Sequence, residues 1–165
     1  MVNLIAFTDR HQATRPLDEV VAAAVDGGAR LVVLREEDLP EEERLALADR
    51  LRALVGDRLL LTGVDYPGRF CHSIEELDAA RDAPFATLSP IYPTRSKPGY
   101  GPPIGLAGLA RICTAAAVAV YALGGVDTPQ RVRECLAQGA SGVAVMGAIM
   151  RAADPARTVK ELITW

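Results

Sequence analysis

The residues best suited to chemistry lie in one long loop near the middle of the chain, at residues 88–106. Thr94 and Ser96 carry hydroxyl groups that donate hydrogen bonds. Arg95 and Lys97 alternate with them and carry positive charge. Such groups suit an anionic phosphate or pyrophosphate. Because the loop follows the end of a predicted strand and is rich in glycine and proline, it is able to close over a ligand.

Two glycine sites that follow predicted strands point to the same ligand chemistry. Gly124 and Gly125 come directly after the strand predicted at Val118–Leu123, and Gly147 comes directly after Val143–Met146. A glycine lacks a Cβ atom, so its backbone N–H group is able to approach a phosphate closely. In a (β/α) barrel the loops after the last two strands are the usual place for a phosphate. We therefore expect the chain to bind a phosphorylated small molecule.

Short apolar segments alternate with longer segments whose apolar residues recur at helical spacing, which is typical of βα units with parallel strands. The predicted strands are Leu4–Thr8, Leu31–Leu34, Leu59–Leu61, Phe70–Cys71, Phe85–Leu88, Val118–Leu123 and Val143–Met146. The predicted helices begin near Leu17, Pro40, Ser73, Ile104 and Asp154, and one more begins at a cap that is either Asp127 or Thr128. The second helix is expected to bury Leu45, Ala48, Leu51 and Val55. One unit recurs, since Val25–Leu34 resembles Leu136–Val145, and this repetition favours a barrel.

We expect one domain over residues 1–165, with an α/β fold of the TIM-type (β/α) barrel class shortened to about seven strands. The shortage lies between Leu59–Leu61 and Phe70–Cys71, because neighbouring parallel strands need a crossover of about a dozen residues or more. Either a βα unit is missing after the third strand, or the local pairing is not parallel. A missing unit would expose strand edges and apolar surface, so we also expect a homo-oligomer.

The composition excludes several classes of protein. A formal charge of −3 and a pI near 5.4 give no field that would attract nucleic acid. The longest apolar run, Ala115–Leu123, is shorter than the roughly 20 residues that cross a bilayer, and the first residues lack the features of a signal peptide. We expect a cytoplasmic protein with no nucleic-acid or membrane partner. The three cysteines form no CxxC pair, so neither a disulfide framework nor a zinc site is indicated.

The motifs along the chain resemble those of the thiamine phosphate synthase and thiazole tautomerase superfamily, of which this chain looks like a shortened, divergent member. The resemblance covers nearly the whole chain and is carried by Phe7–Arg10, Leu31–Glu36, His72–Leu77, Ser89–Lys97, Ala122–Val126 and Gly139–Met146. It implies a (β/α) barrel. It also implies the synthase activity, in which a hydroxymethylpyrimidine pyrophosphate is joined to a thiazole phosphate and pyrophosphate is released with the help of magnesium.

The resemblance further implies roles for individual residues. Arg35, Ser96 and Lys97 match positions that bind the pyrophosphate. The matching positions for the thiazole phosphate and its surroundings are Thr94, Gly124, Gly125, Met146 and Gly147. Arg35 and Lys97 are therefore the predicted catalytic cations, because cations and backbone dipoles stabilise a departing pyrophosphate.

Several departures from the family pattern affect the pyrophosphate and the metal. Val33, Arg35 and Glu37 stand where the synthase pattern is Gln-x-Arg-x-Lys, so an amide is lost and a cation becomes an anion. Thr62-Gly63 stands where an Asn-Asp pair helps to bind magnesium, and the next segment, with a second metal-binding Asp, is missing. Asp65 is the only nearby carboxylate that could substitute. Magnesium is thus the implied cofactor, although its usual ligands are absent and no metal ligand is assigned.

Two alternatives to an active synthase stay open. One is a catalytically impaired or regulatory protein that keeps the thiazole-phosphate half of the site. The other is a tautomerase or isomerase of a phosphorylated heterocycle, with His72 or Tyr92 as the proton carrier. His72 is a predicted catalytic residue because it lies at a strand end, but a hydrogen bond to nearby backbone explains it equally well. The tautomerase branch has its catalytic His where Pro90 stands here.

Overall fold

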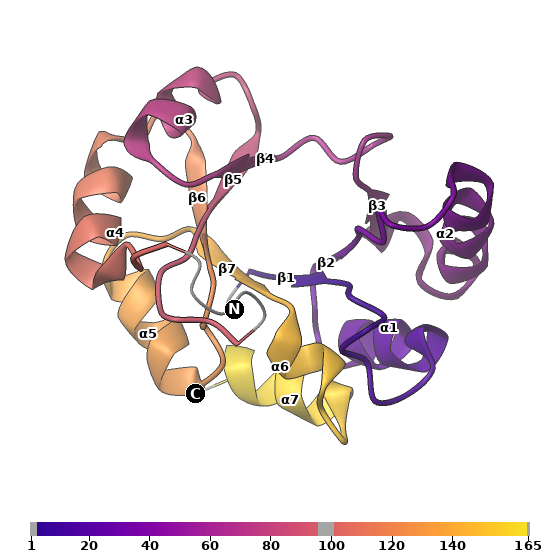
Figure 1. Ribbon diagram of the computed structural model, residues 1–165. Helices are drawn as coiled ribbons and strands as arrows, with labels where there is room; N and C mark the ends of the chain where they lie inside the picture. The colour runs from indigo at the N-terminus through magenta and orange to yellow at the C-terminus, as the bar shows by residue number, and fades with distance from the viewer. Residues whose placement is uncertain (1–2, 96–100, 165) are drawn as a thin grey trace. The chain divides into compact units, whose positions relative to one another are not determined.

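The structure is a computed structural model that describes residues 3–95 and 101–164. It consists of two compact units. The terminal unit comprises residues 4–66 and 146–165, and the central unit comprises residues 1–3 and 67–145. Both units are built from parallel strands followed by helices, as the alternating pattern predicts (Figure 1).

In the terminal unit the strands form a parallel sheet in the order β3-β2-β1. Its strands are β1 (Leu4–Phe7), β2 (Leu31–Leu34) and β3 (Leu59–Leu61). Its helices are α1 (Leu17–Asp26), α2 (Glu41–Val55), the 3₁₀ helix η1 (Gly56–Arg58), α6 (Gly147–Met150) and α7 (Pro155–Ile163). Helix α1 packs against α2 and α7, and the apolar faces of these helices bury the core that β1 and β2 line.

In the central unit the strands form a parallel sheet in the order β7-β6-β5-β4. Its strands are β4 (Arg69–Cys71), β5 (Phe85–Leu88), β6 (Ala119–Leu123) and β7 (Gly142–Val145). Its helices are α3 (Ile74–Ala79), α4 (Gly105–Ala115) and α5 (Pro129–Ala137). The predicted caps are present, since Ser73 and Thr128 each accept a hydrogen bond from the third residue of the helix that follows.

The connection from β3 to β4, residues 62–68, contains turns and no helix. Strand β3 is parallel to β2, and β4 is parallel to β5. Pairing is therefore parallel on both sides of the connection, which rules out the alternative of a non-parallel pairing there. A missing βα unit after the third strand is the account that remains. The seven parallel strands confirm the predicted shortened α/β fold.

The structure differs from the sequence predictions in small ways. Thr8, Val118 and Met146 lie just outside the strands to which the sequence assigned them. Leu45 was expected in the core, but it is 40% exposed. The buried stripe of α2 consists of Leu47, Ala48 and Leu51, and it is too narrow to include Leu45.

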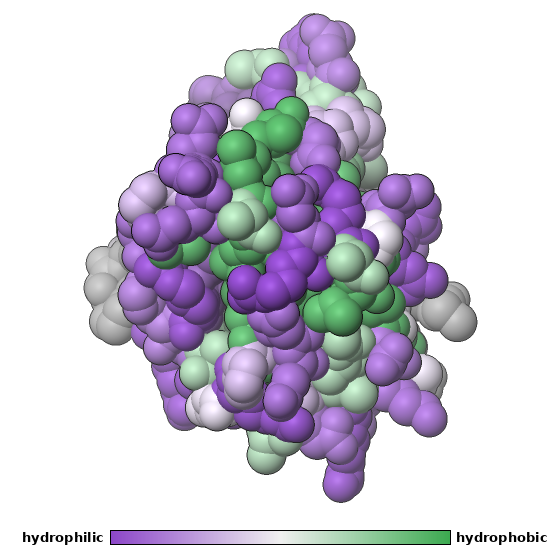
Figure 2. All heavy atoms as spheres, turned by 90° about the vertical axis from the view of Figure 1, so that its right-hand side faces the viewer, coloured by the Kyte–Doolittle hydropathy of each residue, from purple (hydrophilic) through white to green (hydrophobic). Residues whose placement is uncertain are grey.

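The surface of the terminal unit carries some apolar side chains among many charged ones. The large apolar residues exposed there are Leu45, Leu54 and Val64, and the last of these lies three residues after the end of β3. Apolar and polar residues are interspersed over the face shown in Figure 2. Over the described ranges, no helix is both long and apolar enough to cross a membrane.

Candidate active site

In the central unit, the loop after β5 is hydrogen-bonded to the glycine turn after β6. The backbone N–H of Ile91 donates to the carbonyl of Leu123 at 2.9 Å. The N–H of Tyr92 donates to the carbonyl of Gly124 at 3.0 Å. The predicted ligand loop and the predicted glycine turn therefore form one substructure at the carboxyl ends of two neighbouring strands.

Both glycines of this turn have backbone conformations that favour glycine, with φ +95° at Gly124 and +69° at Gly125. A Cβ atom on Gly124 would lie 2.8 Å from the Cα atom of Pro90, and one on Gly125 would lie 2.6 Å from the carbonyl oxygen of Pro93. The sequence predicts a close approach of a ligand to these glycines, but in the structure it is the loop after β5 that lies against them. The N–H of Gly125 donates to no other described residue, so it is available to an anion.

A group of side chains from α5 fixes this loop and turn together. The hydroxyl of Tyr92 donates to Glu134 Oε2 at 2.6 Å, and the guanidinium carbon of Arg131 lies 4.6 Å from the centre of the Tyr92 ring. Arg131 Nη1 also donates to the carbonyl of Gly125 at 2.8 Å. Burial, and next the hydrogen bond to Glu134, raise the pKa of Tyr92 well above its usual range. Tyr92 therefore positions the loop, and its hydroxyl is poorly suited to carry a proton.

His72 lies at the carboxyl ends of β4 and β5, as the sequence predicts. Its Nδ1 lies 3.0 Å from the carbonyl oxygen of Ser89 and 3.3 Å from the Ser89 hydroxyl, so the ring contacts Ser89 through this nitrogen. Its backbone N–H donates to Glu76 Oε2 at 2.6 Å. The hydrogen bond to backbone that was the simpler account of His72 is therefore present, and the ring is exposed.

The remaining predicted residues of the loop are only partly described. Thr94 is half-buried and follows Pro93, whose carbonyl contacts Gly125. Ser96 and Lys97 lie outside the described residues, so their roles stay predictions.

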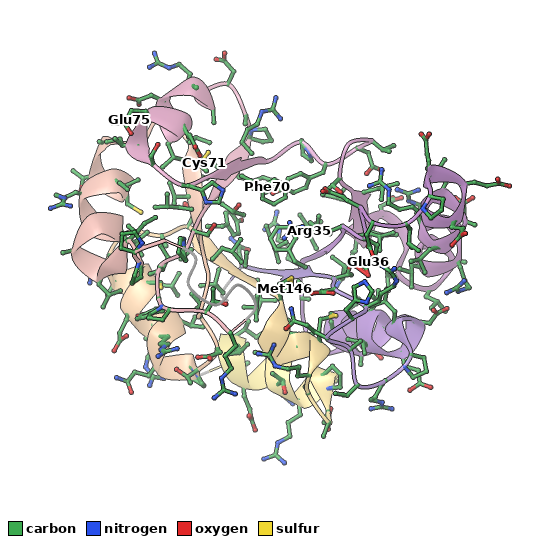
Figure 3. The ribbon with its side chains drawn as sticks, viewed as in Figure 1. Arg35, Glu36, Phe70, Cys71, Glu75 and Met146 are labelled. Atoms are coloured by element: carbon green, nitrogen blue, oxygen red, sulfur yellow. The ribbon has the colours of Figure 1, made fainter. Side chains whose placement is uncertain are left out.

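In the terminal unit, Arg35 and Glu36 follow β2 and point in different directions (Figure 3). The guanidinium carbon of Arg35 lies 6.0 Å from the centre of the Phe7 ring. Glu36 has a positive φ of 32°, and its buried carboxylate accepts from the Thr8 hydroxyl at 3.1 Å and from the Arg10 N–H at 2.6 Å. The Thr8 hydroxyl in turn accepts from the Arg35 N–H at 3.2 Å. Glu36 therefore fixes the backbone that carries Arg35.

Arg10 is occupied by carboxylates. Its guanidinium donates to both oxygens of Asp38, at 2.6 and 2.8 Å, and lies 3.4 Å from Glu36. Hydrogen bonds from Arg10, and next from His11, hold the pKa of the Asp38 carboxyl well below its usual range. Arg10 is thus balanced by neighbouring anions.

Gly147, at the start of α6, is covered by the side chain of Arg151, which follows the last residue of that helix. A Cβ atom on Gly147 would lie 2.5 Å from Nη1 of Arg151. Arg151 also hydrogen-bonds to Gln12 in the loop after β1. Met146 precedes Gly147 and is labelled in Figure 3. The absence of a side chain at position 147 therefore makes room for a guanidinium, and the predicted roles of Met146 and Gly147 in phosphate binding stay predictions.

The residues after β3 do not fit a magnesium site. Asp65, the only candidate ligand there, uses Oδ1 to accept from the Leu61 N–H at 2.6 Å and Oδ2 to accept from Arg52 at 2.6 Å. It closes the turn after β3, which is a structural role. Thr62 and Gly63 offer no carboxylate. In the part of the chain that the structure describes, no three His, Cys, Asp or Glu side chains gather as a metal site.

The guanidinium of Arg44 lies beside Thr62, just after β3. Arg44 of α2 donates from Nη1 to the carbonyl oxygen of Thr62 at 2.9 Å and to its hydroxyl at 3.3 Å. The same nitrogen lies 3.5 Å from the carbonyl oxygen of Arg35. A Cβ atom on Gly63 would be 4.0 Å from Arg44 Nη2. The ends of β2 and β3 are therefore bridged by a guanidinium.

Comparison with known proteins now identifies the family. Residues 68–149 match the family model described as thiamine monophosphate synthase. A putative thiamine-phosphate synthase of Geobacter sulfurreducens is 36% identical over 98% of this chain and 92% of its own length. The chain belongs to the thiamine-phosphate synthase family. A thiamine-phosphate synthase of Salinispora tropica, 35% identical over 98% of the chain and 74% of its own length, supports this family of thiamine-biosynthesis transferases.

Solved structures agree with the thiamine-phosphate synthase fold. The thiamine phosphate pyrophosphorylase of Pyrococcus furiosus superposes with a TM-score of 0.82 at 26% identity, over 98% of this chain and 93% of that one. This likeness confirms the predicted TIM-like fold. The alignment with the Geobacter relative extends over 198 residues, whereas this chain has 165, so that relative has stretches with no counterpart here. The difference is about the size of one βα unit.

Several residues that organise the site escaped the sequence analysis. They are Glu36, Arg44, Arg131 and Arg151. A signal existed for Arg44, because a cation in the first turn of a helix opposes the helix dipole and therefore needs another reason for its place. The contacts of Arg131 and Arg151 are made across loops, and no local pattern predicts them.

Proposed function

We propose that the chain is a thiamine phosphate synthase-type transferase, which joins a hydroxymethylpyrimidine pyrophosphate to a thiazole phosphate. In this reaction the bond between the pyrimidine CH₂ carbon and the pyrophosphate oxygen breaks, and pyrophosphate leaves with the electron pair. The thiazole nitrogen supplies the electron pair of the new C–N bond and becomes positively charged. The observation that carries the proposal is the 36% identity to a synthase relative over 98% of the chain.

The proposed roles follow from the chemistry of each half of the site. Thr94 and the N–H of Gly125 would bind the thiazole phosphate, on a loop and turn held by Arg131. Arg35 would stabilise the negative charge on the leaving pyrophosphate, a role that the family resemblance also implies for Lys97. Bond exchange of this kind needs no proton transfer, so the main demand on the protein is electrostatic. Magnesium has no step in the proposal, because the described carboxylates do not fit it.

The test is product formation from both substrates by the purified chain. Thiamine phosphate is measured by oxidation to its fluorescent thiochrome form, and pyrophosphate is measured in a coupled assay, each with magnesium and with a chelator. We expect both products in equal amounts and a strong loss of rate in Arg35→Gln. Exposed Arg50, which pairs with Asp18 on the surface, provides the matched control Arg50→Gln. Absence of both products under all conditions would remove the proposal.

The second candidate is a non-catalytic protein that keeps only the thiazole-phosphate half. It is favoured by Glu37, an exposed anion close to the end of β2, and by the structural use of Asp65. It predicts thermal stabilisation by thiazole phosphate without formation of product. Stabilisation together with turnover would exclude it.

The third candidate is an isomerase or tautomerase that uses His72, whose exposed ring lies at the carboxyl ends of β4 and β5. It predicts turnover of a phosphorylated heterocycle by a single-substrate reaction, and loss of that turnover in His72→Ala. Unchanged synthase activity in His72→Ala would remove His72 from the catalytic residues.

The proposal extends to the partners and the setting of the chain. Relatives named thiamine-phosphate synthase act on phosphorylated small molecules, and we propose the same ligand class here. We also propose a homo-oligomer in the cytoplasm. Sedimentation at micromolar concentration tests whether the chain forms a homo-oligomer. Fractionation of cells tests whether it lies in the cytoplasm.

A further inference from the structure

The half-buried guanidinium of Arg44 lies at the carboxyl ends of two paired strands. Strands β2 and β3 are in parallel register, with Leu34 opposite Leu61. Arg44 Nη1 donates to Thr62 and lies 3.5 Å from the carbonyl oxygen of Arg35. Arg44 therefore brings its positive charge to the ends of β2 and β3, beside the backbone of Arg35, whose own guanidinium carbon lies 6.0 Å from the centre of the Phe7 ring.

The charge of Arg44 is not balanced by a carboxylate in the ranges 3–95 and 101–164. Two carboxylates near the strand ends, Glu36 and Asp65, have other partners. Glu36 accepts from Thr8 and Arg10, and Asp65 accepts from Leu61 and Arg52. Glu37 is exposed and forms no ion pair with Arg44 within that part of the chain. A half-buried cation without an anion is unfavourable, which indicates that an anion from solution completes this site.

The position of Arg44 in α2 points the same way. It is the fourth residue of the helix, and its backbone N–H donates to the carbonyl of Pro40 at 2.9 Å. The first turn of a helix favours anions, and a cation there is disfavoured. The bonds that Arg44 donates to described residues all come from Nη1, so the N–H groups on Nη2 and Nε remain for a ligand.

We propose that Arg44, with Arg35, forms a metal-independent binding site for pyrophosphate at the ends of β2 and β3. A guanidinium stands where the family expectation places magnesium ligands, and it supplies positive charge and donors to phosphate oxygens without a metal ion. The inference deepens the proposed function and rests on it for the identity of the ligand. It also explains how the chain tolerates Thr62-Gly63 in place of the expected Asn-Asp pair.

The experiment measures pyrophosphate binding by isothermal calorimetry, so that it does not depend on turnover. The intact chain is titrated with pyrophosphate in the presence of a chelator and then with added magnesium. We expect binding with the chelator present, and a change of less than about twofold on adding magnesium. In Arg44→Gln the dissociation constant should rise about tenfold or more, because a charge-assisted pair of donors is lost.

Two further variants make the outcome decisive. Arg44→Lys keeps the charge but loses the planar fork of donors, and we expect an intermediate loss of affinity. Arg50→Gln removes a surface charge from the same helix and should bind as the unaltered chain does. Far-ultraviolet circular dichroism shows whether each variant is folded; if Arg44→Gln is not, Arg44→Lys decides alone. Two results would overturn the proposal. One is pyrophosphate binding that requires magnesium, and the other is a folded Arg44 variant that binds pyrophosphate as tightly as the unaltered chain does.

The design separates this inference from the proposed function. If pyrophosphate binds without a metal and depends on Arg44, but no thiamine phosphate forms, the proposed transferase function is wrong and the proposed pyrophosphate site stands. Product formation that requires magnesium and is indifferent to Arg44 would refute the site and leave the transferase.

Discussion

The central and terminal units hold their candidate ligand groups by different means. In the central unit these groups are a backbone N–H and a hydroxyl, on a turn whose glycines are in contact with the neighbouring loop. In the terminal unit they are the charged side chains of Arg35, which follows β2, and of Arg44, which belongs to α2. A site formed by backbone groups depends on a few glycines that no other residue type is able to replace. In a site formed by side chains, a charged group is able to come from a different position of the chain.

The departures from the family pattern follow this difference. Most of them, at Val33, Glu37 and Thr62-Gly63, fall in the terminal unit. The glycine turn and the start of the ligand loop, which carry part of the family resemblance in the sequence, lie in the central unit. A cation from a new position, Arg44, is able to take over from a metal, but no side chain is able to replace a glycine at positive φ with its Cβ position filled.

The largest effect is expected from Gly125→Ala, which tests the backbone-based half. An alanine at φ +69° would be strained, and its Cβ would lie 2.6 Å from the carbonyl oxygen of Pro93. We expect a loss of about 3 kcal/mol or more in the free energy of unfolding, from strain and overpacking together. Binding of thiazole phosphate should fall with it. Urea unfolding and calorimetry measure the two effects.

Gly56 provides a matched control for this variant. Its φ is +64°, but a Cβ atom there would meet nothing within 4 Å. Gly56→Ala should therefore lose about 1–3 kcal/mol, from backbone strain alone because its ψ is −142°, and keep its affinity for thiazole phosphate. Equal losses in the two variants would mean that loop contact on Gly125 does not matter.

Next in size is Glu36→Gln, which tests how the side-chain half is held. The variant removes the charge of a buried carboxylate that accepts from Thr8 and Arg10, so about 1–3 kcal/mol of unfolding free energy should be lost. Asp38→Asn removes a carboxylate from the same arginine at an exposed position, and its loss should be smaller than that of Glu36→Gln. Chemical denaturation compares them, and a larger effect at Asp38 would contradict the assigned order of importance.

Tyr92→Phe should have a smaller effect and separates positioning from proton transfer. The variant loses the hydrogen bond to Glu134, which contributes about 1 kcal/mol, and keeps the ring under Arg131. We expect a severalfold rise in KM for thiazole phosphate with little change in kcat. A double-mutant cycle with Glu134→Gln measures the coupling. Abolished turnover would instead support Tyr92 as a proton carrier.

The sequence predicted the fold well because its signals are local. Strands at Leu31–Leu34, Leu59–Leu61 and Phe85–Leu88 are found with the predicted bounds, and the caps at Ser73 and Thr128 are as expected. Leu45 was misplaced because helical spacing indicates which residues share a face, but the width of the buried stripe depends on packing partners.

The candidate site was only partly predictable, for a physical reason. Gly124 and Gly125 indicate that some group approaches the backbone closely, but the sequence does not show that this group is the loop at Pro90 and Pro93. Arg44 is separated from Thr62 by the rest of α2, by η1 and by β3, so their contact depends on the tertiary fold. Residues that bind through backbone are visible in a motif, whereas residues that replace a lost group are visible only in three dimensions.

The smallest effect on stability, yet an informative one, is expected from Val64→Ser. Val64 is 62% exposed and follows β3, which is paired with β2 in its own unit. Its replacement should change the free energy of unfolding by less than about 0.5 kcal/mol, because little area is buried there. If the shortened fold self-associates through the edge left by the missing βα unit, the same variant should weaken association in analytical ultracentrifugation. Leu45→Ser, on the exposed face of α2, is the comparison: equal weakening by both variants would mean that association is a general apolar effect, and weakening by Val64→Ser alone would locate it beside β3.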